Sequence, residues 1–428
     1  MALADRYGLP LSTASSVAAD AYVKAADQLL AAGADLLAGF DAALDLDGGF
    51  ALAEIGRARC LVTYGQGAQA KASAARARDL AAGATRRERG HVEALALAVE
   101  GRGAEALAAI KVHLAEFPRD AMVLQPATGI FGLIGFSGRL YREAEILALL
   151  DDLAPSFGDD WWFMSIHAFA ECEAGRLSAA ERRVGRALEA APHNANAAHV
   201  RAHVHYELGE AARGADFLRA WLPGYSPAGL LRGHLSWHLA LWELGVGRRD
   251  AAHDLYEREF GAPLRGGGAP TPPLNVLSDV VSWLWRAQLC GEPARVDEWR
   301  QVAAFAAERF AQAGVTFADV HAALAYARTG DGAALERLSG QLMQLAVDRP
   351  ASAVAATLAI GFAAHARGDW AEAARQLGAV HESVVRIGGS RAQRELVDRG
   401  LLDACRRAGL DGKAAALIAA RPQLSRGA

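Results

Sequence analysis

The feature that most constrains the fold is a repeated spacing of glycine, a small residue and proline along the chain. In a complete repeat, a small residue follows the glycine by five positions and a proline follows it by seventeen. The complete spacing occurs at Gly101-Ala106-Pro118 and Gly175-Ala180-Pro192, and its first step occurs at Gly209-Gly214, Gly368-Ala373 and Gly409-Ala414. Such regular punctuation indicates that one structural unit recurs along the chain.

Each residue of this spacing has a physical role in a helical hairpin. The glycine ends the first helix, where the backbone needs a positive φ. The small residue allows the second helix to pack closely on the first, and the proline ends that second helix. Gly209 follows Gly175 by 34 residues, which is the tetratricopeptide period. The sequence therefore predicts an all-α fold of tetratricopeptide-type helical hairpins, stacked into a right-handed superhelix.

One segment interrupts the helical pattern. Residues 261–275 read GAPLRGGGAPTPPLN, which is too rich in glycine and proline for a helix. We therefore expect N-terminal repeats over 1–260, a loop over 261–275, and C-terminal repeats over 276–428 that continue the same solenoid. The loop is interpreted either as a linker between two helical parts or as a lid over a binding surface.

Composition limits the classes of function. The 428 residues are 52% apolar, which allows a large buried core, and the formal net charge is −4. Because no basic excess is visible, nucleic acid is not expected as a partner. The N-terminus lacks an apolar signal region and no apolar run approaches the length of a membrane helix, so we expect a cytoplasmic protein that does not bind membranes. The cysteines are widely spaced, which favours reduced thiols over disulfides (Cys60, Cys172, Cys290 and Cys405).

Two pairs of histidines stand out in successive helical stretches. His199 and His203 are four residues apart, and so are His234 and His238. Four residues make about one helical turn, so each pair lies on one helix face, roughly 6 Å apart along the axis. Helical-repeat proteins usually place apolar or solvated side chains at such positions. The pairs therefore predict a site for a metal, an anion or proton transfer, and all four histidines are candidate catalytic residues.

The repeat frame also suggests a metal site. Aligned on Gly209, the frame puts His199, His203 and Glu207 at the fifth, ninth and thirteenth positions of a first helix, which face the concave surface of such solenoids. Imidazole and carboxylate ligands suit Zn²⁺, Mn²⁺ or Fe²⁺. These three residues are candidate ligands of a divalent metal. The sequence has no HExxH motif, so spacing alone fixes no ligand set and the cofactor stays unknown.

Other residues are candidates for the same site. Asp279 is a candidate partner that would orient a histidine and raise its basicity, although it could equally stabilise a helix N-terminus. His167 and His321 lie on other first helices, where a superhelix could bring them toward the same axis. Trp237 and Trp283 could form an apolar wall of a pocket or simply pack between helices.

A glycine-rich interruption near the C-terminus allows two interpretations. Gly388, Gly389 and Ser390 break a helical stretch and are followed by Arg394. They could form an ordinary hairpin turn. They could also form an anion site, with backbone N–H groups at the start of the next helix and an arginine clamp.

Several stretches resemble one tetratricopeptide family, the tetratricopeptide repeat protein 38-like proteins. The stretch Arg386–Arg394, RIGGSRAQR, is the most specific. Weaker matches are GLIGFSG at 132–138, WFMSIH at 162–167, AHVRAHV at 198–204, HLSWHLAL at 234–241, VSWLWR at 281–286 and FADVHAAL at 317–324. The resemblance implies a helical-repeat fold and no settled activity. This chain has Arg391 where the resemblance leads us to expect histidine.

Two functions remain open at this stage. In the first, the histidine-rich concave surface forms an enclosed pocket for a small polar or anionic molecule, with His/Asp acid–base chemistry of hydrolytic or eliminative type. In the second, the groove is a non-enzymatic scaffold for a protein or peptide. Histidines and aromatics at the groove positions favour a small-molecule ligand over a peptide. The sequence does not decide whether a reaction is catalysed, and it allows a homo-oligomer.

Overall fold

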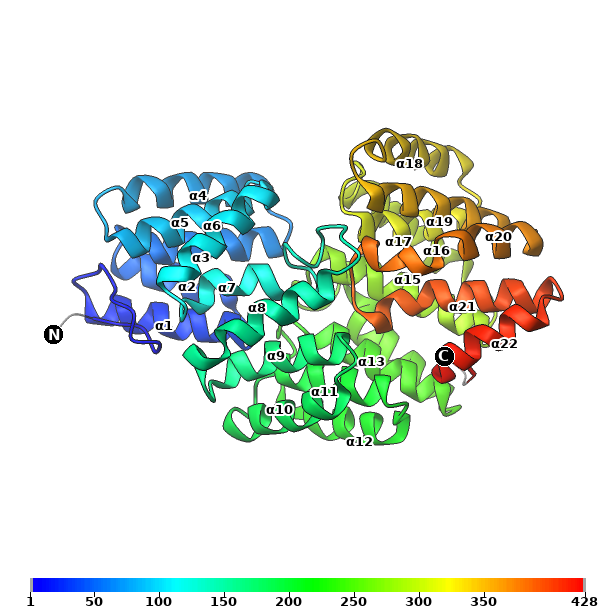
Figure 1. Ribbon diagram of the computed structural model, residues 1–428, viewed down its shortest axis with the longest axis horizontal. Helices are drawn as coiled ribbons and strands as arrows, with labels where there is room; N and C mark the ends of the chain where they lie inside the picture. Colours follow the sequence, from blue (N-terminus) through cyan, green and yellow to red (C-terminus); the bar gives the residue numbers. More distant parts are fainter. Residues whose placement is uncertain (1–2, 426–428) are drawn as a thin grey trace. The chain divides into compact units, whose positions relative to one another are not determined.

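The computed structural model describes residues 3–425, and within that range it contains helices but no β-strand (Figure 1). The first helices along the chain are α1 (Ser16–Leu30), α2 (Leu36–Leu46), α3 (Ala51–Thr63), α4 (Gly67–Ala81), α5 (Arg86–Val99), α6 (Gly103–Glu116), α7 (Ala121–Thr128), α8 (Arg142–Phe157), α9 (Trp161–Glu173), α10 (Leu177–Ala190) and α11 (Ala195–Glu207). The remaining α-helices are α12 (Ala211–Trp221), α13 (Arg232–Gly245), α14 (Arg249–Leu255), α15 (Pro273–Leu289), α16 (Val296–Arg309), α17 (Thr316–Thr329), α18 (Gly332–Leu345), α19 (Pro350–Ala366), α20 (Trp370–Val380), α21 (Arg391–Arg407) and α22 (Asp411–Ala420). Short 3-10 turns are η1 (Leu222–Gly224), η3 (Ala262–Arg265), η4 (His381–Ile387) and η5 (Pro422–Ser425), and η2 (Tyr256–Phe260) is a π-helical turn.

The chain forms two compact units. One comprises the chain up to Gly135, Glu143–Val200 and Gly224–Leu231; the other comprises Phe136–Arg142, Arg201–Pro223 and the chain from Arg232 onward. In the first unit, one continuous apolar core runs from Tyr7 to Ala170. In the second unit, the first helices of successive hairpins pack beside one another in the order α13, α15, α17 and α19. The second unit therefore places α13, which carries His234 and His238, beside α15, which carries Asp279.

The turns between paired helices confirm the all-α tetratricopeptide-type prediction. The first helix of each of these hairpins ends just before a glycine with φ between +69° and +80°: Gly101 after α5, Gly175 after α9, Gly209 after α11, Gly368 after α19 and Gly409 after α21. A residue with a Cβ atom is strained in that conformation, whereas glycine adopts it without cost. The helices on either side of the glycine pack on each other, as in α5/α6, α9/α10 and α19/α20.

The small-residue position of the frame also has the expected role. Ala106, Ala180 and Ala373 are fully buried. At Gly214, an added Cβ atom would lie 2.4 Å from the Trp242 ring of α13. The tryptophan therefore occupies the space that a side chain at Gly214 would need, and α12 packs close to α13 for this reason.

The segment 261–275 is only partly a loop. Its residues include the 3-10 turn η3, and α15 already begins at Pro273. Proline suits the first position of a helix because its missing N–H has no helical acceptor there. The segment lies inside the second unit, and whether it acts as linker or lid stays a prediction, as does the proposed division of the chain at this point.

Within residues 3–425, none of the helices combines the length and the apolar character needed to span a bilayer.

The contact at Gly214 generates a test. We expect Gly214→Ala to lower the free energy of unfolding by about 1 to 3 kcal/mol, because the methyl group overpacks the site against Trp242. The intrinsic helix propensity of alanine would change stability in the opposite direction. Urea unfolding followed by far-UV circular dichroism measures the difference. Gly340→Ala in α18, where nothing lies within 4 Å of the added atom, is the matched control and should not lose stability.

Candidate functional site

Four histidines come together on α11 and α13. They are His199, His203, His234 and His238, and all four are buried. One ring nitrogen from each histidine lies within 4.8 Å of the corresponding nitrogens of the other three. We call this group the histidine cluster. His199 and His203 lie one turn apart on the continuous helix α11. The rings of His203 and His234 both contact His238 edge to face, with centroids 4.7 and 4.9 Å away.

Asp279 on α15 orients one member of the cluster. The Nδ1 atom of His234 lies 2.9 and 3.0 Å from the two carboxylate oxygens of Asp279, and both side chains are buried. The hydroxyl of Ser278 also donates to Asp279, at 3.3 Å. A carboxylate accepts hydrogen bonds, so the proton of His234 lies on Nδ1 and its Nε2 atom carries the lone pair. Asp279 therefore has a direct side-chain role beyond the charge of a helix N-terminus.

Tryptophans fix the rings of α13 in place. The ring of Trp237 stacks on His234 at 5.1 Å and meets His238 edge to face at 4.6 Å. The guanidinium of Arg286 lies 5.7 Å from the centre of the Trp237 ring. Trp242 lies 6.2 Å from His238. Because these rings are large and buried, they restrict the rotamers of His234 and His238.

Burial keeps part of the cluster uncharged. Burial lowers the pKa of His203 well below its ordinary value, and the neighbouring His234 lowers it further. A neutral imidazole has a nitrogen lone pair, which a metal ion or an acidic proton can use. The cluster thus offers several buried nitrogen donors beside the Asp279 carboxylate, a set suited to metal binding or to proton transfer.

Glu207 does not extend the histidine stripe. Its Oε2 atom lies 3.2 Å from Nε of Arg391, and its Oε1 atom lies 3.5 Å from Nη2 of Arg421. Burial raises the pKa of Glu207, and the two arginines oppose that effect. The four-histidine group contains His199 and His203 but not Glu207, which the structure places against these arginines instead. Glu207 is the last residue of α11, and there it meets arginines.

The other predicted histidines have separate environments. His167 on α9 binds Asp151 of α8 through Nε2 at 2.8 Å. His321 on α17 donates from Nδ1 to the carbonyl of Phe317, one turn earlier, at 2.7 Å. Neither belongs to the four-histidine group.

Trp283 packs against aromatic side chains. Its ring stacks on Tyr256 at 6.0 Å and meets Phe260 edge to face at 5.9 Å. Trp283 is fully buried, which matches the packing alternative for this residue. Trp237, in contrast, touches the cluster directly.

The glycine interruption near the C-terminus forms a helix cap. Ser390 is the N-cap of α21, and its side chain and backbone exchange hydrogen bonds with Gln393 in a capping box. Arg394 donates to the carbonyl of Gly389, and so does Arg142 at 2.5 Å. These contacts match the hairpin-turn interpretation. Gly389 has φ +73°, and a Cβ atom there would lie 2.3 Å from the Phe317 ring, so only glycine fits.

Sequence reasoning missed a buried charge network between α15, α21 and α11. Glu395 accepts hydrogen bonds from Tyr206 at 2.7 Å and Arg399 at 2.8 Å, and it lies 3.4 Å from Arg286. Burial alone would raise the pKa of Glu395, but the arginines around it hold the value at about 2. The partners of Glu395 lie about a hundred residues or more away in sequence, except Arg399 and Arg421, so no local spacing could reveal the network.

A second missed constellation lies in the first unit. Asp120 contacts Nδ1 of His91 at 3.0 Å, Nε2 of His113 at 2.9 Å and the guanidinium of Arg87 at 3.0 Å. Burial raises the pKa of Asp120, yet these partners together hold it well below its ordinary value. Arg87 also donates to the carbonyl of Pro10. The constellation thus ties the N-terminal segment to α5, α6 and α7.

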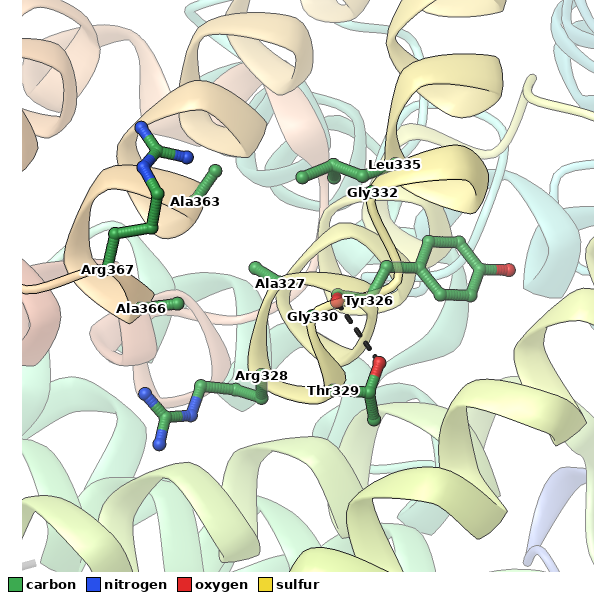
Figure 2. A pocket seen from close by; sticks show the side chains of 10 residues that line it. All are labelled: Tyr326, Ala327, Arg328, Thr329, Gly330, Gly332, Leu335, Ala363, Ala366 and Arg367. Carbon is green, nitrogen blue, oxygen red and sulfur yellow. Dashed lines mark hydrogen bonds between the residues drawn. The ribbon is translucent and has the colours of Figure 1, made fainter.

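A cavity of about 510 Å³ lies at the ends of α17 and α19 (Figure 2). Arg328 and Arg367 both contribute to its lining, together with Tyr326, Thr329 and glycine, alanine and leucine residues. Figure 2 shows the two arginines on the same side of the view, from α17 and from the end of α19. None of the residues predicted from the sequence lines this cavity.

No family model matches the chain. Among solved structures, the chain is similar to a human IFIT1 dimer with m7Gppp-AAAA, at 14% identity and a TM-score of 0.43, covering 99% of this chain and 94% of that one. It is also similar to a human IFIT1 dimer with PPP-AAAA, at 13% identity and a TM-score of 0.40, covering 97% and 96%. The P58(IPK) TPR domain matches at 16% identity and a TM-score of 0.21, covering 92% and 99%. At these values the likeness concerns the helical-repeat fold and assigns no ligand to this chain.

One sequence-based expectation is corrected by these structures. The absence of a basic excess led us to exclude nucleic acid as a partner, yet the similar IFIT1 structures hold m7Gppp-AAAA and PPP-AAAA. The exclusion therefore does not stand. The exclusion rests on the net charge of −4, which sums the whole chain and does not describe the charge of any one surface.

The environment of His321 generates a pH prediction. Burial lowers its pKa to about 4, against about 6.5 in the unfolded chain. Between these two values the unfolded state binds more protons, so stability is lost as the pH falls from about 6.5 to about 4. The shift corresponds to about 3 kcal/mol.

We expect His321→Gln to remove this contribution. The difference in unfolding free energy between the wild type and the variant should fall as the pH is lowered from 7 to 4, measured by urea unfolding at a series of pH values. The nearby Asp319 and the histidine cluster are present in both proteins and cancel in the difference. A difference that stays constant across this range would contradict the assignment.

Proposed function

We propose that the histidine cluster is the functional centre of this helical-repeat protein, and that it binds a small polar or anionic molecule. His234 acts there as a general acid–base group oriented by Asp279. The observation that carries this proposal is the buried His234–Asp279 pair, with Nδ1 at 2.9 Å from the carboxylate, inside a group of four histidines.

The geometry supports a distinct role for each residue in this proposal. Asp279 accepts the Nδ1 proton of His234, which fixes the tautomer and leaves Nε2 as the basic atom. Trp237 stacks on the same ring and prevents it from turning away. An oriented imidazole with a carboxylate partner can take a proton from a ligand and return it, as hydrolytic or eliminative steps require.

The burial of the histidines favours a small ligand over a peptide scaffold. Each histidine of the cluster is no more than 7% exposed. A peptide held along an open groove would need exposed side chains, whereas a small molecule can be enclosed among buried ones.

The resemblance noted in the sequence is consistent with this location. The stretches 198–204 and 234–241, which resemble the tetratricopeptide repeat protein 38-like proteins, are the stretches that carry the four histidines. We propose that the chain is a relative of those proteins and acts in the cytoplasm.

Nitrogen-detected NMR of histidine-labelled protein tests the acid–base assignment. We expect neutral His234 to be the Nδ1–H tautomer because it binds Asp279 through Nδ1, and neutral His167 to be the Nε2–H tautomer because it binds Asp151 through Nε2. In Asp279→Asn the His234 tautomer should change, since an amide can donate as well as accept. An unchanged His234 spectrum in Asp279→Asn would remove Asp279 from the site.

A thermal-shift screen of metal-free protein tests ligand binding. The panel contains small carboxylates, inorganic phosphate, phosphate esters, amino acids and the oligonucleotide PPP-AAAA. We expect a small polar or anionic compound to raise the Tm of the wild type and not that of Asp279→Asn. Asp403→Asn, which removes the carboxylate from His365 elsewhere in the fold, should respond as the wild type does. Stabilisation by the oligonucleotide alone, or equal shifts in Asp279→Asn, would contradict the proposal.

A further inference from the structure

The histidine cluster also has the composition of a metal site, and we infer that it binds one divalent transition-metal ion. This inference rests on the proposed function in so far as it concerns the same side chains. It adds the identity of a bound species, a cation of the Zn²⁺ or Co²⁺ class, held by imidazole nitrogens of His199, His203, His234 and His238.

The spacing of the donors supports this assignment. The four nitrogens lie within 4.8 Å of one another, and they come from two helices whose faces carry an i, i+4 pair each. Nitrogen ligands about 2.1 Å from a tetrahedral ion are separated by about 3.4 Å, so modest side-chain rotation closes the group around one ion. Two i, i+4 pairs supply such a set without any change in the helix backbone.

Asp279 supplies the outer partner that metal-bound histidines usually have. A ligating histidine donates its other ring N–H to a carboxylate or carbonyl, which fixes the ring and strengthens the ligand. The Nδ1 atom of His234 makes this contact with both oxygens of Asp279. The Nε2 atom of His234 is therefore the one that faces the ion in the metal-bound protein, and it acts as a base only in the metal-free protein.

The donor set selects among metals. Neutral imidazoles suit Zn²⁺, Co²⁺, Ni²⁺ and Cu²⁺, whereas Mg²⁺ and Ca²⁺ prefer several oxygen ligands. The carboxylate of Asp279 contacts Nδ1 of His234 and not its Nε2 atom. An ion held by uncharged rings keeps most of its positive charge, so an anionic molecule can complete its coordination.

Other buried histidines serve as internal comparisons. His205 is buried and lies on α11, between His203 and the C-terminal end of that helix. Its Nδ1 atom pairs with Glu210 at 2.9 Å. It belongs to the same helix but not to the four-histidine group. A variant at His205 therefore changes the same helix and the same residue type without touching the proposed ligands.

Metal titration of the full-length protein is the test. The protein is dialysed against EDTA and then titrated with Co²⁺ and with Zn²⁺, and the bound ion is counted by elemental analysis. We expect one ion per chain, visible absorption bands typical of Co²⁺ bound to nitrogen, and a rise in Tm with Zn²⁺. His203→Ala and His238→Ala should lose the Co²⁺ bands, Asp279→Asn should bind Zn²⁺ about 10 to 100-fold more weakly, and His205→Ala should match the wild type.

Folding is controlled separately. Circular dichroism of each metal-free variant shows whether it is folded, and His203→Gln replaces His203→Ala if the alanine variant unfolds. Less than one tightly bound ion per wild-type chain overturns the metal site, as does equal loss of Co²⁺ binding in His205→Ala. The ligand screen uses metal-free protein, and NMR reports the His234–Asp279 pair without metal. A negative titration beside a positive screen therefore overturns the metal site alone, and a positive titration beside a negative screen overturns the proposed ligand binding alone.

Discussion

The structure depends on how closely the two helices of each hairpin approach and how tightly the chain turns between them. Glycines with positive φ, such as Gly175 and Gly209, end the first helices in a conformation that other residues resist. Small residues such as Gly214 then let the next helix pack against its neighbour. Because these constraints recur, the first helix of one hairpin in the second unit packs beside the first helix of the next hairpin, as α13 does beside α15. The contact of His203 on α11 with His238 on α13, and that of His234 with Asp279 on α15, follow from this order.

Buried charge is distributed unevenly over this scaffold. Around Glu395, the arginines and Tyr206 compensate one carboxylate, and around Asp120, Arg87 and two histidines do the same. A buried ion pair of this kind costs desolvation energy, and removing one partner leaves an uncompensated charge. These networks join segments that are distant in sequence, including the N-terminal segment with α5 and α21 with α15. Their role in the fold is sufficient to explain their presence.

Local spacing predicts what repeats, and it fails where a contact links distant residues. The period, the glycine turns and the buried small residues follow from the sequence, since each depends on neighbours within one hairpin. The i, i+4 pairs at His199 and His234 follow for the same reason. The repeat frame does not fix which face of α13 meets α11. It groups Glu207 with the histidines of α11, whereas in the structure Glu207 pairs with Arg391 of α21 and with Arg421 near the C-terminus. Asp279 is 45 residues from His234, so the sequence allows it either to pair with a histidine or to stabilise a helix N-terminus, and the structure shows the contact with His234.

The histidine cluster differs from the other buried polar groups in what surrounds it. In the Asp120 network, two histidines share one carboxylate, whereas in the cluster Asp279 contacts His234, and His203 and His238 contact other rings. Apolar residues of similar volume would fill such a position without the cost of desolvating four imidazoles and a carboxylate. Tryptophans already occupy the adjacent space, so packing alone gives no reason for the polar choice. A ligand or an ion bound to these groups, as proposed, would offset the stability lost by burying them, because binding to the folded state alone stabilises it.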